Sequence, residues 1–365
     1  MKKKFDFNQS PLLVFYEVTQ ACDLVCKHCR ASAQTSCHPN QLDPQQALAL
    51  VDQIAQFPTP PLLVITGGDP LKRTDLYQII KYAKSKDLTV AITPSATPLL
   101  TTDTIDKLKD AGIDRMALSL DSHCQKTHDS FRGLQGSFNK TIQALQYANQ
   151  IGISLQINTT VTADNAHQID DIANWLTDKN IDLWSVFFLI QVGRGNALKP
   201  IAPQTYETLF QKLLEHAAIQ PYAIKTTEAH HYRRYVLQQG AKARKMLQNT
   251  PSDRIHRSPL GVNDGNGVMF VSHTGEIYPS GFMPIHCGTF PQQSIIQTYQ
   301  NHPQFTQLRK PKQYQGKCGQ CQYTNICGGS RARAYAATGN PTASDPDCVY
   351  IPPKWEQTQA AIAKV

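Results

Sequence analysis

The sequence predicts an α/β fold, in which a partial, TIM-like (β/α)6 barrel precedes a smaller, cysteine-rich α+β module. Three observations predict it. Apolar segments of strand length alternate with amphipathic helical segments from Leu12 to about Ile190, which is typical of parallel βα units. These apolar segments number six, whereas a closed barrel of this kind has eight strands. The pattern changes near residue 200, and cysteine-rich segments follow.

The elements of the barrel can be placed in order along the chain. The expected strands span residues 12–18, 61–67, 88–93, 115–120, 153–161 and 183–190. The expected helices span residues 43–57, 75–86, 101–112, 138–152 and 166–180. Capping residues indicate three helix starts (Asp43, Thr101 and Asn139), and glycines indicate two helix ends (Gly112 and Gly152). N-cap side chains accept hydrogen bonds from free N–H groups, and glycine readily adopts the left-handed conformation beyond a helix.

The remaining chain divides into a linker and a second module. Residues 202–217 and 229–247 have helical patterns, and residues 267–281 are typical of a hairpin that turns at His273-Thr274-Gly275. We therefore expect a barrel over residues 10–200, a helical linker over 201–257 and a cysteine-rich domain over 258–352.

Composition and charge exclude several classes of protein. The chain has 365 residues, 41% of them hydrophobic, and no apolar run long enough to cross a membrane. The basic start MKKKFDFNQS has no apolar segment of signal-peptide type behind it, so we expect a cytoplasmic protein. The net charge of +8 suits an anionic substrate or an acidic electron donor. It also fits a generic basic surface, and no basic run or basic–aromatic stripe indicates nucleic acid.

Three cysteines with the spacing C-x3-C-x2-C follow the first expected strand, at Cys22, Cys26 and Cys29. Active-site loops lie at the carboxyl ends of barrel strands. Three thiolates can hold three corners of a [4Fe–4S] cubane and leave the fourth iron open. Zinc is an alternative, but it needs a fourth ligand, and His28 lies between two of the cysteines. A group of free thiols is the second alternative.

Residues 19–29, TQACDLVCKHC, closely resemble the signature loop of the radical S-adenosylmethionine (SAM) superfamily. The resemblance implies a partial barrel and a [4Fe–4S] cluster whose open iron binds SAM. It also implies reduction by an external one-electron donor such as flavodoxin or ferredoxin. The resulting 5′-deoxyadenosyl radical would take a hydrogen atom from the substrate.

Further segments resemble the SAM-binding motifs of that superfamily. Residues 66–70, TGGDP, resemble its glycine-rich GGEP motif, with Asp in place of Glu. The resemblance implies that this backbone meets the methionine amino group of SAM, and that polar residues at later strand ends face its ribose, carboxylate or adenine. Turn and cap roles are the alternative for each such residue. The resulting candidates for cofactor binding are Gly67, Gly68, Asp69, Ser95, Ser119, Asp121, Asn158 and Arg194. No catalytic side chain is singled out.

A second set of cysteines, Cys318, Cys321, Cys327 and Cys348, has the spacing C-x2-C-x5-C-x20-C. Four thiolates suit either zinc or a fully ligated cluster. The segment resembles the SPASM/twitch extension of radical SAM enzymes, which implies an auxiliary [4Fe–4S] cluster. Ser280 stands where a full SPASM domain has another cysteine, which argues for one auxiliary cluster. Cys287 is a candidate substitute ligand, or else an ordinary thiol.

The C-terminal segments 267–284, 327–339 and 345–350 resemble the haem-biosynthesis branch of radical SAM/SPASM proteins. That resemblance implies a tetrapyrrole substrate and oxidative decarboxylation of a propionate. Arg331, Arg333 and the run 230–234 are candidates for binding its carboxylates, although a solvated helix face and compensation of cluster charge are alternatives. A radical SAM peptide maturase with a precursor-peptide partner, and a non-enzymatic zinc or iron–sulfur scaffold, remain the rival functions.

Overall fold

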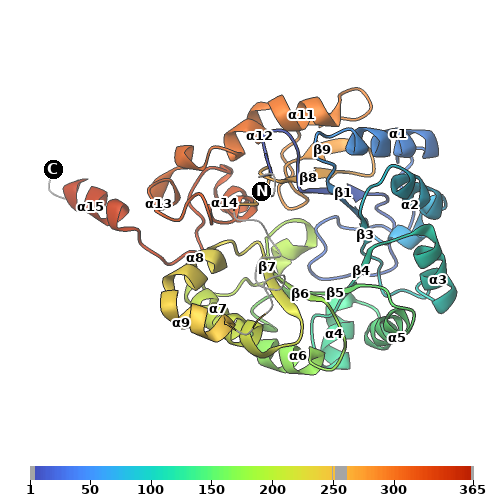
Figure 1. Ribbon diagram of the computed structural model, residues 1–365, viewed down its shortest axis with the longest axis horizontal. Helices are drawn as coiled ribbons and strands as arrows, with labels where there is room; N and C mark the ends of the chain where they lie inside the picture. Colours follow the sequence, from blue (N-terminus) through green and yellow to red (C-terminus); the bar gives the residue numbers. More distant parts are fainter. Residues whose placement is uncertain (1–4, 249, 251–260, 363–365) are drawn as a thin grey trace.

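The computed structural model describes residues 5–248, 250 and 261–362. Over these residues the strands form a single ten-stranded sheet in the order β10-β9-β8-β1-β2-β3-β4-β5-β6-β7. Strands β1 to β7 run parallel, each beside the next. Their bounds are Leu13–Glu17, Leu62–Thr66, Val90–Ile92, Arg115–Ser119, Leu155–Val161, Leu183–Phe188 and Ala223–Thr227. The sheet curves but does not close (Figure 1), which confirms the partial barrel.

Helices cover the convex outer face of this sheet (Figure 1). They are α1 Pro44–Ala55, α2 Leu76–Ser85, α3 Thr102–Ala111, α4 Gln125–Arg132, α5 Ser137–Gln150, α6 Ile169–Leu176 and α7 Pro203–Ile219. Asp43 and Thr101 cap α1 and α3 as predicted, and Gly112 ends α3 with a φ of +95°. The predicted cap at Asn139 is wrong, because α5 begins after Gly136 and Asn139 lies within its first turn. Helix α4 was not predicted.

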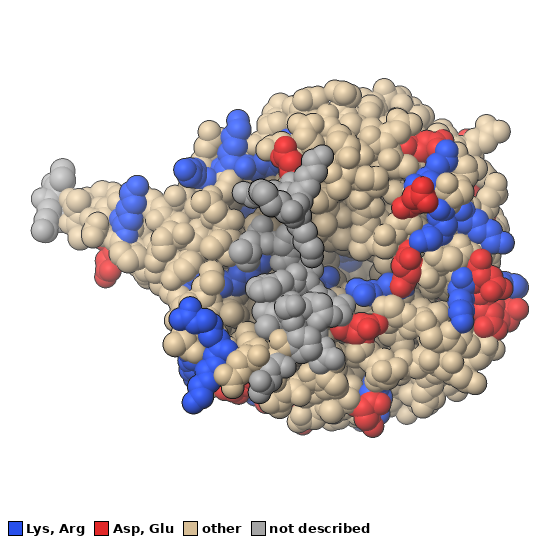
Figure 2. Space-filling model, in the orientation of Figure 1, with Lys and Arg blue, Asp and Glu red and all other residues tan. Residues whose placement is uncertain are grey.

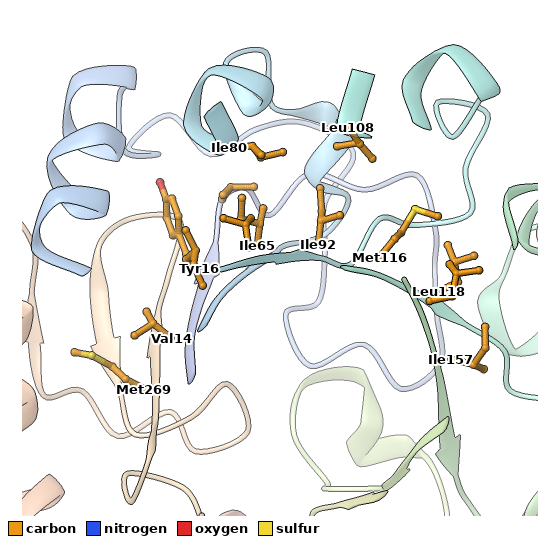
Figure 3. Packing of buried hydrophobic residues seen from close by; sticks show 14 of the residues in the cluster. Val14, Tyr16, Ile65, Ile80, Ile92, Leu108, Met116, Leu118, Ile157 and Met269 are labelled. Carbon is orange, nitrogen blue, oxygen red and sulfur yellow. The ribbon is translucent and has the colours of Figure 1, made fainter. Parts of the chain in front are cut away.

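The main core lies between the sheet and these helices. Strand residues such as Ile65 and Ile92 point toward the helix residues Ile80 and Leu108 (Figure 3). Burial alternates along β5, since Leu155, Ile157, Thr159 and Val161 are buried and the residues between them are partly exposed. Those intervening residues are Gln156, Asn158 and Thr160. Alternate strand residues point to opposite faces, so the concave face of β5 is polar.

Residues 201–257, expected to be a helical linker, contain a strand as well as helices. Strand β7 pairs with β6 and extends the parallel sheet, and α8 His231–Gln238 and α9 Gly240–Leu247 follow it. Its residues, Ala-Ile-Lys-Thr-Thr, include one large apolar side chain. The apolar pattern by which the other strands were recognised is therefore absent from it.

The predicted hairpin is present and joins the second module to the barrel. Strands β8 Val268–Val271 and β9 Glu276–Tyr278 are antiparallel, and Gly275 turns the chain with a φ of +88°. Strand β8 also pairs in parallel with β1, and Met269 lies beside Val14 in the core (Figure 3). The short strand β10, Gly288–Thr289, completes this edge.

The C-terminal region adds short helices around the second cysteine set. They are α11 Ile295–Asn301, α12 Pro303–Leu308, α13 Gly316–Gly319, α14 Arg331–Thr338 and α15 Pro353–Ile362, and α15 projects from the body (Figure 1). Basic side chains gather at α9, where Lys242, Arg244 and Lys245 are exposed, whereas both signs mix at the opposite edge (Figure 2). Within the described part of the chain, no helix has the length and apolar character needed to span a bilayer.

Candidate active site

The first three cysteines lie on the loop that leaves the carboxyl end of β1. Cys22 and Cys26 are buried, with 6% and 8% of their surface exposed, and both pack with Leu24 in one small apolar cluster. Cys29 packs against the same cluster and is half-buried. All three are free thiols. The structure thus brings the three predicted ligands together.

Each of these sulfur atoms has a hydrogen-bond donor or acceptor from the chain. The donors to sulfur are Leu24 N to Cys22 Sγ (3.3 Å), Ala33 N to Cys29 Sγ (3.5 Å) and Arg132 Nη1 to Cys26 Sγ (3.8 Å). Burial raises the pKa of Cys22 to about 11 and also raises the pKa of Cys26. Such thiols keep their protons at neutral pH unless a bound metal removes them. The donor set therefore fits a metal centre with soft ligands.

The glycine turn after β2 packs directly against this loop. A Cβ atom on Gly67 would lie 2.6 Å from Thr19 O, and one on Gly68 would lie 2.5 Å from Ala21 O. The amide of Gly68 donates to Thr19 O (2.8 Å), and the amide of Asp69 donates to Ala21 O (2.7 Å). Glycine is required here because the two backbones touch. A ligand amino group donates hydrogen bonds, so it would meet carbonyl oxygens of the turn.

The Asp69 carboxylate is buried and holds neighbouring backbone in place. It accepts hydrogen bonds from Leu71 N (3.2 Å), Ser95 N (3.3 Å) and Thr97 Oγ1 (2.8 Å). Ser95 Oγ donates to Gly68 O (2.9 Å) and accepts a hydrogen bond from Cys22 Sγ (3.7 Å). Asp69 therefore ties the loops after β2 and β3 together, and Ser95 lies beside the first cysteine.

Asp121 lies after β4 and forms a buried ion pair with Arg132, which comes from α4. Asp121 Oδ2 lies 2.6 Å from Arg132 Nη2, and Oδ1 accepts from Thr160 N at 2.8 Å. Burial alone would raise the pKa of Asp121, but the Arg132 guanidinium holds it below its ordinary value. Since Arg132 also donates to Cys26 Sγ, it connects the strand-end carboxylate to the cysteine loop. Sequence reasoning missed Arg132 because α4 was not predicted.

Arg194 holds the cysteine loop from its other side. Its Nε donates to Cys26 O (2.9 Å), its Nη1 to Ala33 O (3.4 Å) and its backbone amide to Cys29 O (3.0 Å). Arg194 is therefore placed beside the cysteines, and these contacts assign it a positioning role.

Ser119 and Asn158 lie opposite each other in the pairing of β4 with β5. Both are partly exposed, and Asn158 Oδ1 accepts from Gln156 Nε2 at 2.7 Å. Asn158 belongs to the partly exposed, polar face of β5. Ser119 and Asn158 therefore remain predictions as ligand contacts.

The four C-terminal cysteines line one small cavity with Arg234 and Lys317. All four are free thiols. Burial raises the pKa of Cys348 to about 11 and that of Cys327 further. Donors again reach the sulfur atoms: Gly329 N to Cys327 Sγ (3.3 Å), Asp345 N to Cys318 Sγ (3.4 Å) and Arg331 Nη2 to Cys318 Sγ (3.7 Å). This set also fits a centre with four thiolate ligands.

The other cysteines lie apart from this cavity. Cys287 is buried in the main core, and its thiol donates to Ile285 O at 3.3 Å. Cys37 and Cys124 are exposed. Ser280, at the position of the SPASM cysteine, hydrogen-bonds with Asp264. Cys287 is thus packed as an apolar side chain.

The side chains that bind a single metal ion converge on one point. Across residues 5–248, 250 and 261–362, no three His, Cys, Asp or Glu side chains converge in this way. A cubane binds each thiolate through a different iron, so its ligands need not converge. Both cysteine sets are therefore compatible with a cubane cluster.

The comparisons with known proteins agree with these features. The family model "Radical SAM superfamily" matches residues 16–176. The "AdoMet-dependent heme synthase" of Oleidesulfovibrio alaskensis is 36% identical over 94% of this chain and 88% of its own. This chain belongs to the radical SAM superfamily. Another similar protein, the "AdoMet-dependent heme synthase" of Methanosarcina barkeri, is 33% identical over 94% of this chain and 98% of its own.

Solved structures show the same radical SAM fold. The crystal structure of Streptococcus suis SuiB bound to S-adenosylmethionine has a TM-score of 0.71 with 17% sequence identity. The match covers 94% of this radical SAM chain and 78% of SuiB. It therefore includes the cysteine-rich C-terminal region, which resembles that of SPASM enzymes. Membership of the superfamily implies a [4Fe–4S] cluster and SAM, and the fold of the C-terminal region suggests an auxiliary cluster.

Proposed function

We propose that this radical SAM enzyme catalyses the oxidative decarboxylation of propionate side chains on an iron porphyrin, as an AdoMet-dependent haem synthase. One observation carries the proposal. Two proteins named as haem synthases, from different organisms, are 36% and 33% identical to this chain over 94% of its length. The identity therefore includes both the barrel and the region with the second cysteine set.

The first cysteine set would hold the cluster that cleaves SAM, through Cys22, Cys26 and Cys29. When bound, this cluster and SAM supply the 5′-deoxyadenosyl radical that removes a hydrogen atom from the substrate. The chain contributes the position of the loop. The Gly68 turn and Arg194 fix its backbone, and Arg132 places a positive charge beside the Cys26 sulfur.

Conversion of a propionate to a vinyl group releases one electron in addition to the hydrogen atom and carbon dioxide. A propionate, –CH2–CH2–COO⁻, loses a hydrogen atom, carbon dioxide and one electron, and a vinyl group remains. The second cysteine set would hold the acceptor of that electron, through Cys318, Cys321, Cys327 and Cys348. A closed set of four thiolates suits electron transfer, since it leaves no iron open to substrate.

The arginines considered for the substrate carboxylates are engaged elsewhere. Arg331 is fully buried and donates to Pro341 O (3.1 Å) and Ala343 O (2.6 Å). Arg333 pairs with Asp347 at 2.9 Å. The run 230–234 is not an exposed face either, because His231 and Arg234 are buried. These contacts indicate structural roles around the second cavity, so they do not support binding of substrate carboxylates there.

The decisive experiment is turnover of the anaerobically reconstituted enzyme with SAM, a reductant and iron-coproporphyrin III. We expect 5′-deoxyadenosine in proportion to vinyl groups formed and carbon dioxide released. A control with the metal-free porphyrin tests whether the substrate iron is needed. Formation of 5′-deoxyadenosine without any vinyl product under these conditions would overturn the assignment of the substrate.

Peptide modification is the second candidate function. A solved structure of SuiB with its precursor peptide SuiA also matches this chain, with a TM-score of 0.70. Its 17% identity concerns the fold alone. A peptide substrate would need a partner peptide, so any precursor peptide encoded beside this gene is the substrate to test in a parallel turnover assay.

Cys318→Ala should distinguish the function of the second cysteine set from that of the first. We expect 5′-deoxyadenosine formation within about twofold of wild type, a loss of roughly four iron atoms per chain, and at least about tenfold less decarboxylated product. Iron and sulfide analysis with product chromatography measures all three. Cys124→Ala, at an exposed thiol, is the matched control and should change none. Full product formation by Cys318→Ala would contradict the proposed role of the second set.

A further inference from the structure

Two buried carboxyl groups meet between the barrel and the second cysteine set. Glu228 follows the last residue of β7 and has 4% of its surface exposed, while Asp264 precedes β8 and has 3% exposed. The two carboxyl groups lie within hydrogen-bonding range of each other. Glu228 adopts a φ of +58°, a conformation that costs energy for a residue other than glycine. The carboxyl group of Glu228 is therefore placed beside Asp264 by a backbone conformation that is unfavourable for this residue.

Both carboxyl groups also contact the start of α14. Ser330 Oγ donates to Glu228 Oε2 at 2.5 Å, and Ala332 N donates to Asp264 Oδ2 at 2.9 Å. Ser280 adds a further hydrogen bond to Asp264. An ionised carboxylate can only accept a hydrogen bond, so these two carboxyl groups bond to each other only when at least one of them holds a proton.

The local environment favours retention of that proton. Burial, reinforced by the neighbouring Asp264, raises the pKa of Glu228 well above its ordinary value, and burial also raises the pKa of Asp264. Charged or titratable groups also face the pair from the neighbouring elements, and they are Arg331 and Arg333 on α14 and Tyr314 before α13. Both arginines donate to other partners, since Arg331 binds backbone carbonyls and Arg333 binds Asp347.

A short series of hydrogen bonds links the pair to the second cysteine set. Glu228 accepts from Ser330 Oγ, and Ser330 N donates to Asp345 Oδ2 at 2.7 Å. The backbone amide of Asp345 donates to Cys318 Sγ at 3.4 Å. Charges in the protein interior are only weakly screened, so a change of charge at the cysteines alters the electrostatic potential at the Glu228–Asp264 pair.

We propose that the Glu228–Asp264 pair takes up one proton from solvent when the cluster held by the second cysteine set gains one electron. The proton returns to solvent when the electron leaves. One negative charge and one positive charge arrive together, so the buried region keeps its net charge. The inference rests on the proposed function for the presence of that cluster, and it deepens the role of the second set as electron acceptor.

The test is the midpoint potential of the second cluster as a function of pH. Measurement in the Cys22→Ala/Cys26→Ala/Cys29→Ala protein leaves this cluster as the one that titrates. We expect the potential to fall as pH rises, by up to about 59 mV per pH unit for one proton per electron. Glu228→Gln should flatten this slope, whereas Glu276→Gln, on β9, should keep it. A flat slope in the parent protein, or an equal slope in Glu228→Gln, overturns the proposal.

A second measurement needs no substitution at Glu228 or Asp264, so it does not depend on whether the Glu228→Gln variant folds. Infrared difference spectra between the oxidised and reduced states, recorded in water and in deuterium oxide, should show a carboxylic C=O band that shifts on exchange. Absence of that band overturns the proposal. Neither experiment uses substrate, so a proton-linked potential without porphyrin turnover would reject the proposed function and leave this inference standing.

Discussion

Replacement of Cys22, Cys26 and Cys29 by alanine should abolish SAM cleavage by this enzyme. The three thiols form one cluster at the end of β1, and they are the proposed ligands of the [4Fe–4S] cluster whose open fourth iron binds SAM. We expect 5′-deoxyadenosine formation to fall by at least about a thousandfold, to the level without catalysis. Iron content should fall by roughly four atoms per chain, with the C-terminal cluster retained.

The reconstituted triple variant is assayed for 5′-deoxyadenosine, iron and sulfide beside two controls. Cys37→Ala and Cys124→Ala remove exposed thiols, and both should cleave SAM at the wild-type rate. A triple variant with wild-type iron content would show that the ligands had been assigned to the wrong residues. Loss of both clusters together would instead indicate that the loop is needed for folding.

Local patterns predicted most of the barrel. The six strands between residues 12 and 190 were recognisable because the faces that they turn toward the helices form a continuous apolar surface, as in the pairing of β1 with β2. Strand β7 lies at an edge of the sheet beside β6, and it was missed because most of its residues are polar and give no apolar pattern. The pairing of β8 with β1 joins residues more than two hundred positions apart, and no local pattern encodes such a partner.

The site was predictable to the extent that spacing encodes it. Cysteine spacing and the glycine turn identified the residues that the structure gathers at β1 and in the second cavity. The partners of those residues depend on tertiary packing. Glycine is needed at position 68 because the backbone oxygen of Ala21 leaves no room for a Cβ atom. The Asp69 carboxylate accepts a hydrogen bond from Thr97, in the loop after β3. Arg132 lies on a helix whose weak apolar pattern gave no reason to expect it.

The buried pair of Asp121 and Arg132 should make a large contribution to the stability of the site. Asp121→Ala leaves the Arg132 guanidinium buried without its counter-ion, and Arg132 has only 8% of its surface exposed. We expect a loss of about 3–5 kcal/mol in the free energy of unfolding, as for other buried pairs that lose one member. Urea unfolding of the reconstituted protein at neutral pH measures this loss.

The pH dependence of this contribution has a definite sign. Arg132 holds the pKa of Asp121 below its ordinary value in the folded chain. The stabilisation is therefore fully present above the unfolded pKa, and it is lost as pH falls through the lower folded pKa. The difference between wild type and Asp121→Ala should accordingly shrink in acid.

Two controls separate the charge from the packing at Asp121. Asp103→Ala removes the exposed ion pair of Asp103 with Lys107 and should cost less than about 1 kcal/mol. The double variant Asp121→Ala/Arg132→Met removes both charges and should recover much of the stability, because no unpaired charge stays buried. Recovery of stability without recovery of SAM cleavage would assign Arg132 a role at Cys26 beyond folding. A loss below about 1 kcal/mol in Asp121→Ala would contradict a buried pair at the cysteine loop.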